Sequence, residues 1–109
     1  MRIILLVTSG LFLAALTSAA HAKALGKHDR ETCNWGAQVA AEAQQSKLSG
    51  VSLYAARKRL QNRRFAKPWM RMTAFGIVEQ TYNSRSALKP AAIRQTYLEQ
   101  CVQHASKRK

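Results

Sequence analysis

Two cysteines, Cys33 and Cys101, carry the most reactive side chains of this chain, and a histidine lies near each of them. His28 stands five positions before Cys33, and His104 stands three positions after Cys101. Two thiolates and two imidazoles can together hold a zinc ion, whereas the two thiols alone can form a disulfide. The H-x4-C and C-x2-H spacings differ from those of zinc fingers and ribbons. The pattern therefore favours a disulfide, provided that the chain is exported to an oxidising compartment.

The first 22 residues have the composition of a secretory signal peptide. Arg2 gives a positively charged start, an apolar run extends from Ile3 to Leu16, and small residues end in Ala20-His21-Ala22. The run is short for a bilayer span, and an A-x-A ending is typical of a cleavage site. The alternative, an uncleaved membrane anchor, would need a longer run. We predict cleavage after Ala22, a single domain over residues 23–109 with short flexible ends, and no transmembrane segment after cleavage.

Export makes a disulfide between Cys33 and Cys101 the expected state of the two thiols, because no third cysteine competes for either partner. The closed loop is long, and chain entropy suggests a stabilisation of about 4 kcal/mol. That is a large share of the total stability of so small a domain. We expect a periplasmic or secreted protein.

The chain is strongly basic, with 18 Lys and Arg against five Asp and Glu. The positive charge is concentrated, since no acidic residue occurs between Ala43 and Val78. Seven cations fall within residues 57–71, with Phe65 and Trp69 between them: Arg57, Lys58, Arg59, Arg63, Arg64, Lys67 and Arg71.

Guanidinium groups bind phosphates and carboxylates through two hydrogen bonds at once, and aromatic rings can stack on a ligand or lie at a lipid interface. We therefore predict that the seven cations form an anion-binding surface, with Phe65 and Trp69 as aromatic contacts. An acidic protein or the lipid head groups of an envelope surface fit as partners. Export and the lack of a recognition motif disfavour nucleic acid. In the alternative interpretation, the cations only solvate an exposed helix and the two aromatic rings pack into the core.

Nothing in the sequence points to catalysis. The five acidic residues are scattered, with no pair at helical spacing, and no nucleophile motif occurs. A disulfide would also remove both cysteines as nucleophiles. We predict a non-enzymatic protein with no catalytic residue, no metal site and no cofactor.

Helical periodicity and punctuation predict four helices. The first begins at Asp29, after a loosely held arm, and places Cys33, Ala37, Ala40 and Gln44 on a face of small residues. Trp35 lies off that face. This helix should end near Ser49 and Gly50, because glycine suits the left-handed cap position.

The remaining helices begin at Ser52, Pro68 and Pro90, residues that favour helix N-termini. The helix from Pro68 has the clearest periodicity and is expected to form the centre of the core. We predict an all-α fold, a compact four-helix domain with one disulfide joining the first and last helices. The apolar positions of the last three helices are Leu53, Ala56 and Leu60; Met70, Ala74, Ile77, Val78, Thr81 and Tyr82; and Ile93, Tyr97, Cys101 and Ala105.

The order of these features resembles that of the small, helical, disulfide-bonded periplasmic proteins of proteobacteria. The resemblance is carried by a cysteine in a small-residue helix (33–43), Gly50-Val51-Ser52 at a helix start, an aromatic-ended third helix (78–82) and a proline-led helix with the second cysteine (90–101). In layout the chain also faintly resembles the immunity proteins that neutralise type VI secretion effectors, including amidase toxins. That resemblance implies an inhibitor of a secreted hydrolase as the alternative function, and it transfers no toxin-blocking residue.

Overall fold

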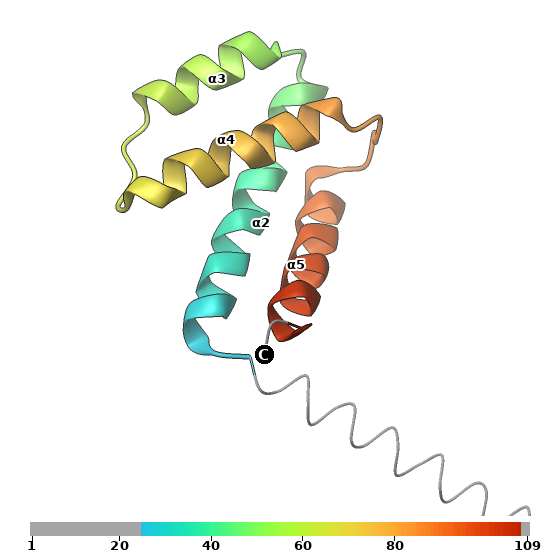
Figure 1. The fold of residues 1–109 in the computed structure, drawn as a ribbon. Helices are drawn as coiled ribbons and strands as arrows, with labels where there is room; N and C mark the ends of the chain where they lie inside the picture. Colours follow the sequence, from blue (N-terminus) through green and yellow to red (C-terminus); the bar gives the residue numbers. More distant parts are fainter. Residues whose placement is uncertain (1–24, 108–109) are drawn as a thin grey trace, which may run out of the picture.

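The computed structural model describes residues 25–107, and every regular element in this range is an α-helix (Figure 1). The predicted all-α fold with four helices is confirmed. The predicted signal peptide and its cleavage site lie outside the described residues. Within residues 25–107 no helix is both long enough and apolar enough to cross a membrane. The helices are α2 (Lys27–Leu48), α3 (Leu53–Asn62), α4 (Pro68–Asn83) and α5 (Pro90–Lys107).

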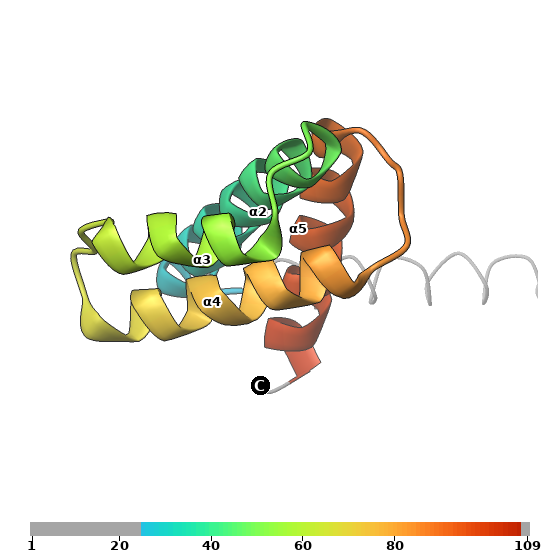
Figure 2. The same cartoon turned by 90° about the horizontal axis from the view of Figure 1, so that it is seen from above.

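Helix α2 is the central element, since it contacts each of the other three helices. α5 runs antiparallel beside it, while α3 and α4 form an antiparallel pair that crosses it (Figure 1 and Figure 2). The third helix, expected to form the centre of the core, supplies three of the eight buried core members, as many as α2 does. Gly36, Ala37 and Ala40 are buried on α2, and such small side chains let neighbouring helices approach closely on more than one side.

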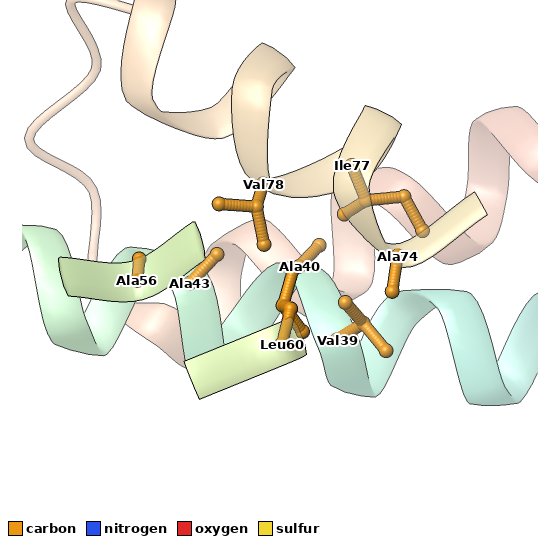
Figure 3. Close-up of a cluster of buried hydrophobic side chains, with 8 residues drawn as sticks. All are labelled: Val39, Ala40, Ala43, Ala56, Leu60, Ala74, Ile77 and Val78. Carbon is orange, nitrogen blue, oxygen red and sulfur yellow. The ribbon is translucent and has the colours of Figure 1, made fainter. Parts of the chain in front are cut away.

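The core lies where α2, α3 and α4 meet (Figure 3). Half of its buried members are alanines, so packing depends on short distances between helix backbones more than on large side chains. Five positions predicted to be apolar core positions are buried: Ala56, Leu60, Ala74, Ile77 and Val78. Val39 is also buried, although it was not on the predicted small-residue face of α2. The cluster comprises Val39, Ala40, Ala43, Ala56, Leu60, Ala74, Ile77 and Val78.

The turn between α2 and α3 has the predicted chemistry. Gly50 has a φ of +85°, and the amides of Gly50 and Val51 donate to the carbonyls of Lys47 and Ser46, respectively. This pair of hydrogen bonds is the Schellman motif, which needs a left-handed residue after the helix. Ser52 then caps α3, because its Oγ accepts a hydrogen bond from the amide of Ala55 at 3.0 Å.

The N-terminus of α2 differs from the prediction. The helix begins at Lys27 with Gly26 as its N-cap, and Asp29 lies in the first turn. The described part of the arm that was expected to be loosely held, residues 25–28, contains the buried Leu25 and the first residues of α2. The carboxylate of Asp29 still lies where it complements the helix dipole.

The disulfide joins Cys33 in α2 to Cys101 in α5, as predicted. The Cα atoms are 5.6 Å apart, and Cys33 is 1% exposed. Because α2 and α5 are antiparallel, one bond near the start of the first helix and the end of the last closes most of the domain into a loop. The bond therefore fixes the two outermost segments of the described chain to each other.

Replacing Cys101 with serine should lower the melting temperature by roughly 15–30 °C, the shift that corresponds to about 4 kcal/mol in a domain of this size. Helicity at low temperature should change little, because α2 and α5 retain their packing. Circular dichroism during thermal unfolding measures both quantities. Reduced wild-type protein is the control for the serine side chain and should shift by a similar amount. An unchanged melting temperature in both would contradict the role of the bond.

A second close contact joins α2 and α5 at Gly36. A Cβ atom at this position would lie 2.7 Å from Oη of Tyr97 and 2.8 and 2.9 Å from two of its ring carbons. Real Cβ atoms do not come so close to ring atoms, so the Tyr97 ring occupies the space that a side chain would need. Burial of the Tyr97 side chain raises the pKa of its hydroxyl by desolvation.

Gly36→Ala should destabilise the domain relative to Gly76→Ala by about 1–3 kcal/mol, the cost of overpacking. Gly76 is the matched control because it is an exposed glycine in α4 with nothing within 4 Å of its would-be Cβ. Its replacement should stabilise α4 by up to about 1 kcal/mol through helix propensity. Urea unfolding measures the difference, and equal stabilities for the two variants would show that the Tyr97 ring moves aside without cost.

Candidate anion-binding surface

The seven predicted cations gather on the α3–α4 hairpin. Arg57, Lys58 and Arg59 lie on α3, the next three lie in the connection 63–67, and Arg71 lies on the first turns of α4. The hairpin is visible as the green-to-orange pair α3 and α4 of the ribbon (Figure 1). The seven cations differ in the groups that their side chains contact.

Arg57 pairs with a carboxylate on the neighbouring helix. Its Nε donates a hydrogen bond to Oε1 of Glu79 on α4. This hydrogen bond lowers the pKa of the Glu79 carboxyl and raises the pKa of the Arg57 guanidinium. Both side chains are accessible to water, so the ion pair links α3 to α4 with only a small effect on stability.

Arg63 pairs with Glu42 of α2, at 3.2 Å between Nη1 and Oε2. This ion pair joins the end of α3 to the middle of the central helix. Both residues that neutralise cations of the hairpin, Glu42 and Glu79, lie just outside the acid-free segment of the sequence.

Arg71 donates hydrogen bonds to backbone carbonyls. Its Nη1 donates to the carbonyls of Leu60 at 2.7 Å and Gln61 at 3.0 Å, and its Nη2 donates to the carbonyl of Arg63 at 2.9 Å. The last carbonyls of a helix have no partner within the helix and carry partial negative charge. Arg71 therefore caps the C-terminus of α3 from the adjoining helix.

Lys47 donates hydrogen bonds to carbonyls at the C-terminus of α4 and just beyond it. Its Nζ donates to the carbonyls of Thr81, Ser84 and Ser86 at 3.2, 3.0 and 2.9 Å. Lys47 thus fixes the end of α4, and the segment that follows it, to α2. Together with Arg57, Arg63 and Arg71, it accounts for half of the eight cations in the acid-free segment as groups with partners inside the fold.

The other four cations are exposed, and no carboxylate in residues 25–107 lies within ion-pairing distance of any of them. Lys58 is 5.3 Å from the ring centroid of the exposed Tyr54, within cation–π range. We call these four cations the unpaired basic surface: Lys58, Arg59, Arg64 and Lys67.

The predicted aromatic contacts, Phe65 and Trp69, both meet Trp35 of α2. The ring centroids are 6.4 Å apart for Trp35–Phe65 and 5.7 Å for Trp35–Trp69, each with edge-to-face geometry. The guanidinium carbons of Arg63 and Arg71 lie 5.4 and 5.2 Å from the Phe65 centroid. Phe65 is therefore part of the packing of the hairpin, as the alternative interpretation expected.

Trp69 differs from Phe65 because it is 37% exposed. Together with Trp35 and Lys67 it lines a shallow crevice of about 100 Å³. The same crevice is also lined by Glu31, so an indole ring, a lysine and an acidic residue all border it. Sequence reasoning missed Trp35 as the partner of both rings, and its only signal was its place off the small-residue face of α2.

The cysteine and histidine set does not form a metal site. Both thiols are used in the disulfide. In the part of the chain that the structure describes, no three His, Cys, Asp or Glu side chains cluster as metal ligands would.

Comparison with protein-family models, with curated proteins and with solved structures finds no match to this chain. The assignment of a function therefore depends on the surface itself.

Arg71→Ala should destabilise the domain by about 1.5–3 kcal/mol, because three carbonyls of the α3 C-terminus lose a charged donor. Arg64→Ala is the matched control, since Arg64 is exposed and outside the three ion pairs, and should change stability by no more than about 0.5 kcal/mol. Urea unfolding followed by circular dichroism compares the two. Equal losses would show that Arg71 is a surface cation like Arg64.

Proposed function

We propose that this protein is an exported, non-enzymatic binding protein whose unpaired basic surface contacts an anionic partner. The observation that carries the proposal is the division among the cations. Four of the eight cations in the acid-free segment form ion pairs with carboxylates or donate hydrogen bonds to backbone carbonyls. The other four are exposed and form no ion pair within residues 25–107: Lys58, Arg59, Arg64 and Lys67.

Unneutralised charge on one hairpin costs free energy through mutual repulsion, and that cost is removed when an anion binds. The whole chain has a formal net charge of +13, so its five acidic residues are too few to neutralise its 18 Lys and Arg. The charge therefore supports an anionic partner from outside the chain.

The disulfide supports the proposed compartment. Disulfides persist in oxidising surroundings, such as the periplasm or the exterior of the cell. Among the anionic partners present there, a lipid surface agrees best with Trp69, because this indole is 37% exposed and lines the same crevice as Lys67, with Glu31 as the one acidic residue of that lining. Indole rings are amphipathic and prefer the interface between lipid head groups and acyl chains.

Binding to vesicles tests this proposal directly. Wild-type protein should bind vesicles of phosphatidylglycerol and phosphatidylcholine, and should bind vesicles of phosphatidylcholine alone weakly or not at all. Raising the ionic strength from 0.05 to 0.5 M should weaken binding strongly, because exposed charges are screened over about 10 Å or less. Co-sedimentation at the two salt concentrations measures the effect.

A variant with Gln in place of Lys58, Arg59, Arg64 and Lys67 should bind these vesicles at least about tenfold more weakly, since each cation near an anionic membrane contributes on the order of 1 kcal/mol. The control variant carries Gln at Arg85, Lys89, Arg94 and Lys107, four exposed cations outside the hairpin. It loses the same net charge and should bind nearly as well as wild type.

Two outcomes would contradict the proposal. Equal losses in the two variants would mean that net charge alone drives binding, and absence of salt-sensitive binding would remove the electrostatic basis altogether. Salt-sensitive binding to an acidic protein, with none to vesicles, would make an acidic protein the anionic partner in place of a lipid surface. It would favour the alternative, an inhibitor or immunity protein, only if that protein were a secreted hydrolase.

A further inference from the structure

A groove separates α4 from α5. The two helices are consecutive in the chain but hardly touch each other, because each packs on α2 instead. A cavity of about 200 Å³ lies between them and is lined by residues of all three helices. It lies away from the unpaired basic surface, and none of that surface's residues lines it.

The buried amide of Gln44 makes this cavity chemically distinctive. Gln44 lies on α2, lines the cavity and is 0% exposed. Its Nε2 donates to the carbonyls of Ser86 at 3.2 Å and Leu88 at 2.7 Å in the connection before α5. These two acceptors fix the orientation of the amide, because the reversed amide would place Oε1 against two carbonyl oxygens.

The Oε1 atom of Gln44 is then the one buried side-chain oxygen or nitrogen in residues 25–107 that has no hydrogen-bond partner. Leaving a buried acceptor without a donor costs about 1–3 kcal/mol. A ligand O–H or N–H group that reached Oε1 would recover that free energy. Reaching it requires a small movement of Gln44 or of a neighbouring side chain of the lining, because less than 1 Å² of Oε1 is accessible to water.

The rest of the lining defines the chemical class of such a ligand. Ala40, Ile77 and Ile93 give apolar contact area, while Gln80, Thr96 and Gln100 are exposed at the same cavity and offer amide and hydroxyl groups. Among the residues that the structure describes, no Lys, Arg, His, Asp or Glu lines the cavity, although the chain is highly charged. The lining therefore selects for neutral groups that both donate and accept hydrogen bonds.

Size restricts the ligand further. Drug-sized ligands fill roughly 300–1,000 Å³, so a cavity of about 200 Å³ admits a single ring with its substituents. We infer that this groove binds one neutral sugar ring, with Gln44 Oε1 accepting a hydrogen bond from a hydroxyl or amide group of that ring. The ring can be a free monosaccharide or the terminal unit of a glycan.

Nuclear magnetic resonance titration of the oxidised protein tests the inference, with glucose, N-acetylglucosamine and its β-1,4-linked disaccharide as probes. The side-chain amide signals of Gln44 and the methyl signals of Ile77 and Ile93 should shift and saturate. A dissociation constant on the order of a millimolar is expected for a ligand this small. Tighter binding of the disaccharide than of N-acetylglucosamine would indicate a glycan end, and equal binding would indicate a free sugar.

Substitutions at the mouth of the groove provide the matched test. Thr96→Trp should fill the mouth and weaken binding at least about tenfold, whereas Gln103→Trp adds the same ring at an exposed position of α5 outside the lining. Both residues are exposed, so neither variant needs a change in the core. Melting temperatures close to that of wild type would confirm that both variants fold.

Three results would overturn the inference. The first is the absence of saturable shifts at Gln44, Ile77 and Ile93 with every sugar. The second is equal binding by the Thr96→Trp and Gln103→Trp variants. The third is stronger shifts of the same signals with inorganic phosphate than with the sugars, because a site for neutral ligands should not prefer an anion.

Discussion

The close approach of other helices to α2 is the constraint on which the rest of the structure depends. Buried glycine and alanine on this helix bring the backbones of α4 and α5 near its axis, and at Gly36 the Tyr97 ring takes the place of a side chain. Such a core buries little apolar surface for each residue, because an alanine contributes far less than a leucine. A domain built this way needs other sources of stability, and the Cys33–Cys101 bond is one of them.

Cations are another source. Lys47 and Arg71 each donate three hydrogen bonds to carbonyls at or just beyond the end of a neighbouring helix. Long basic side chains can reach such carbonyls across a helix pair, which the short side chains of this core cannot do. High positive charge is thus partly a structural property of the molecule. The count of basic residues therefore overstates the charge that is free of ion pairs and carbonyl contacts within the fold.

The sequence was sufficient for the four helices, most of their ends and the disulfide, because local signals determine them, whereas the packing of the helices was not predicted. Gly50, Ser52, Pro68 and Pro90 mark helix ends through their own backbone or capping preferences, and two cysteines allow one intramolecular pairing. The candidate sites could not be predicted in the same way. The partners of Arg57 and Arg63 lie 22 and 21 positions away, and the Arg71 acceptors are carbonyls, which every residue carries. Only the packed helices determine which of these groups meet.

Gln44 shows the same limit most clearly. Its place on the small-residue face of α2 was predictable from spacing, but the acceptors of its amide lie 42 and 44 positions further along the chain. Once Nε2 is committed to those carbonyls, Oε1 must face elsewhere, and no protein group in residues 25–107 meets it. Natural cores rarely leave such an atom unpaired unless the position serves another purpose. The segment that orients Gln44 is also the connection between α4 and α5, the two helices that border the groove, so the orientation of this amide depends on the same segment that links the two sides of the groove.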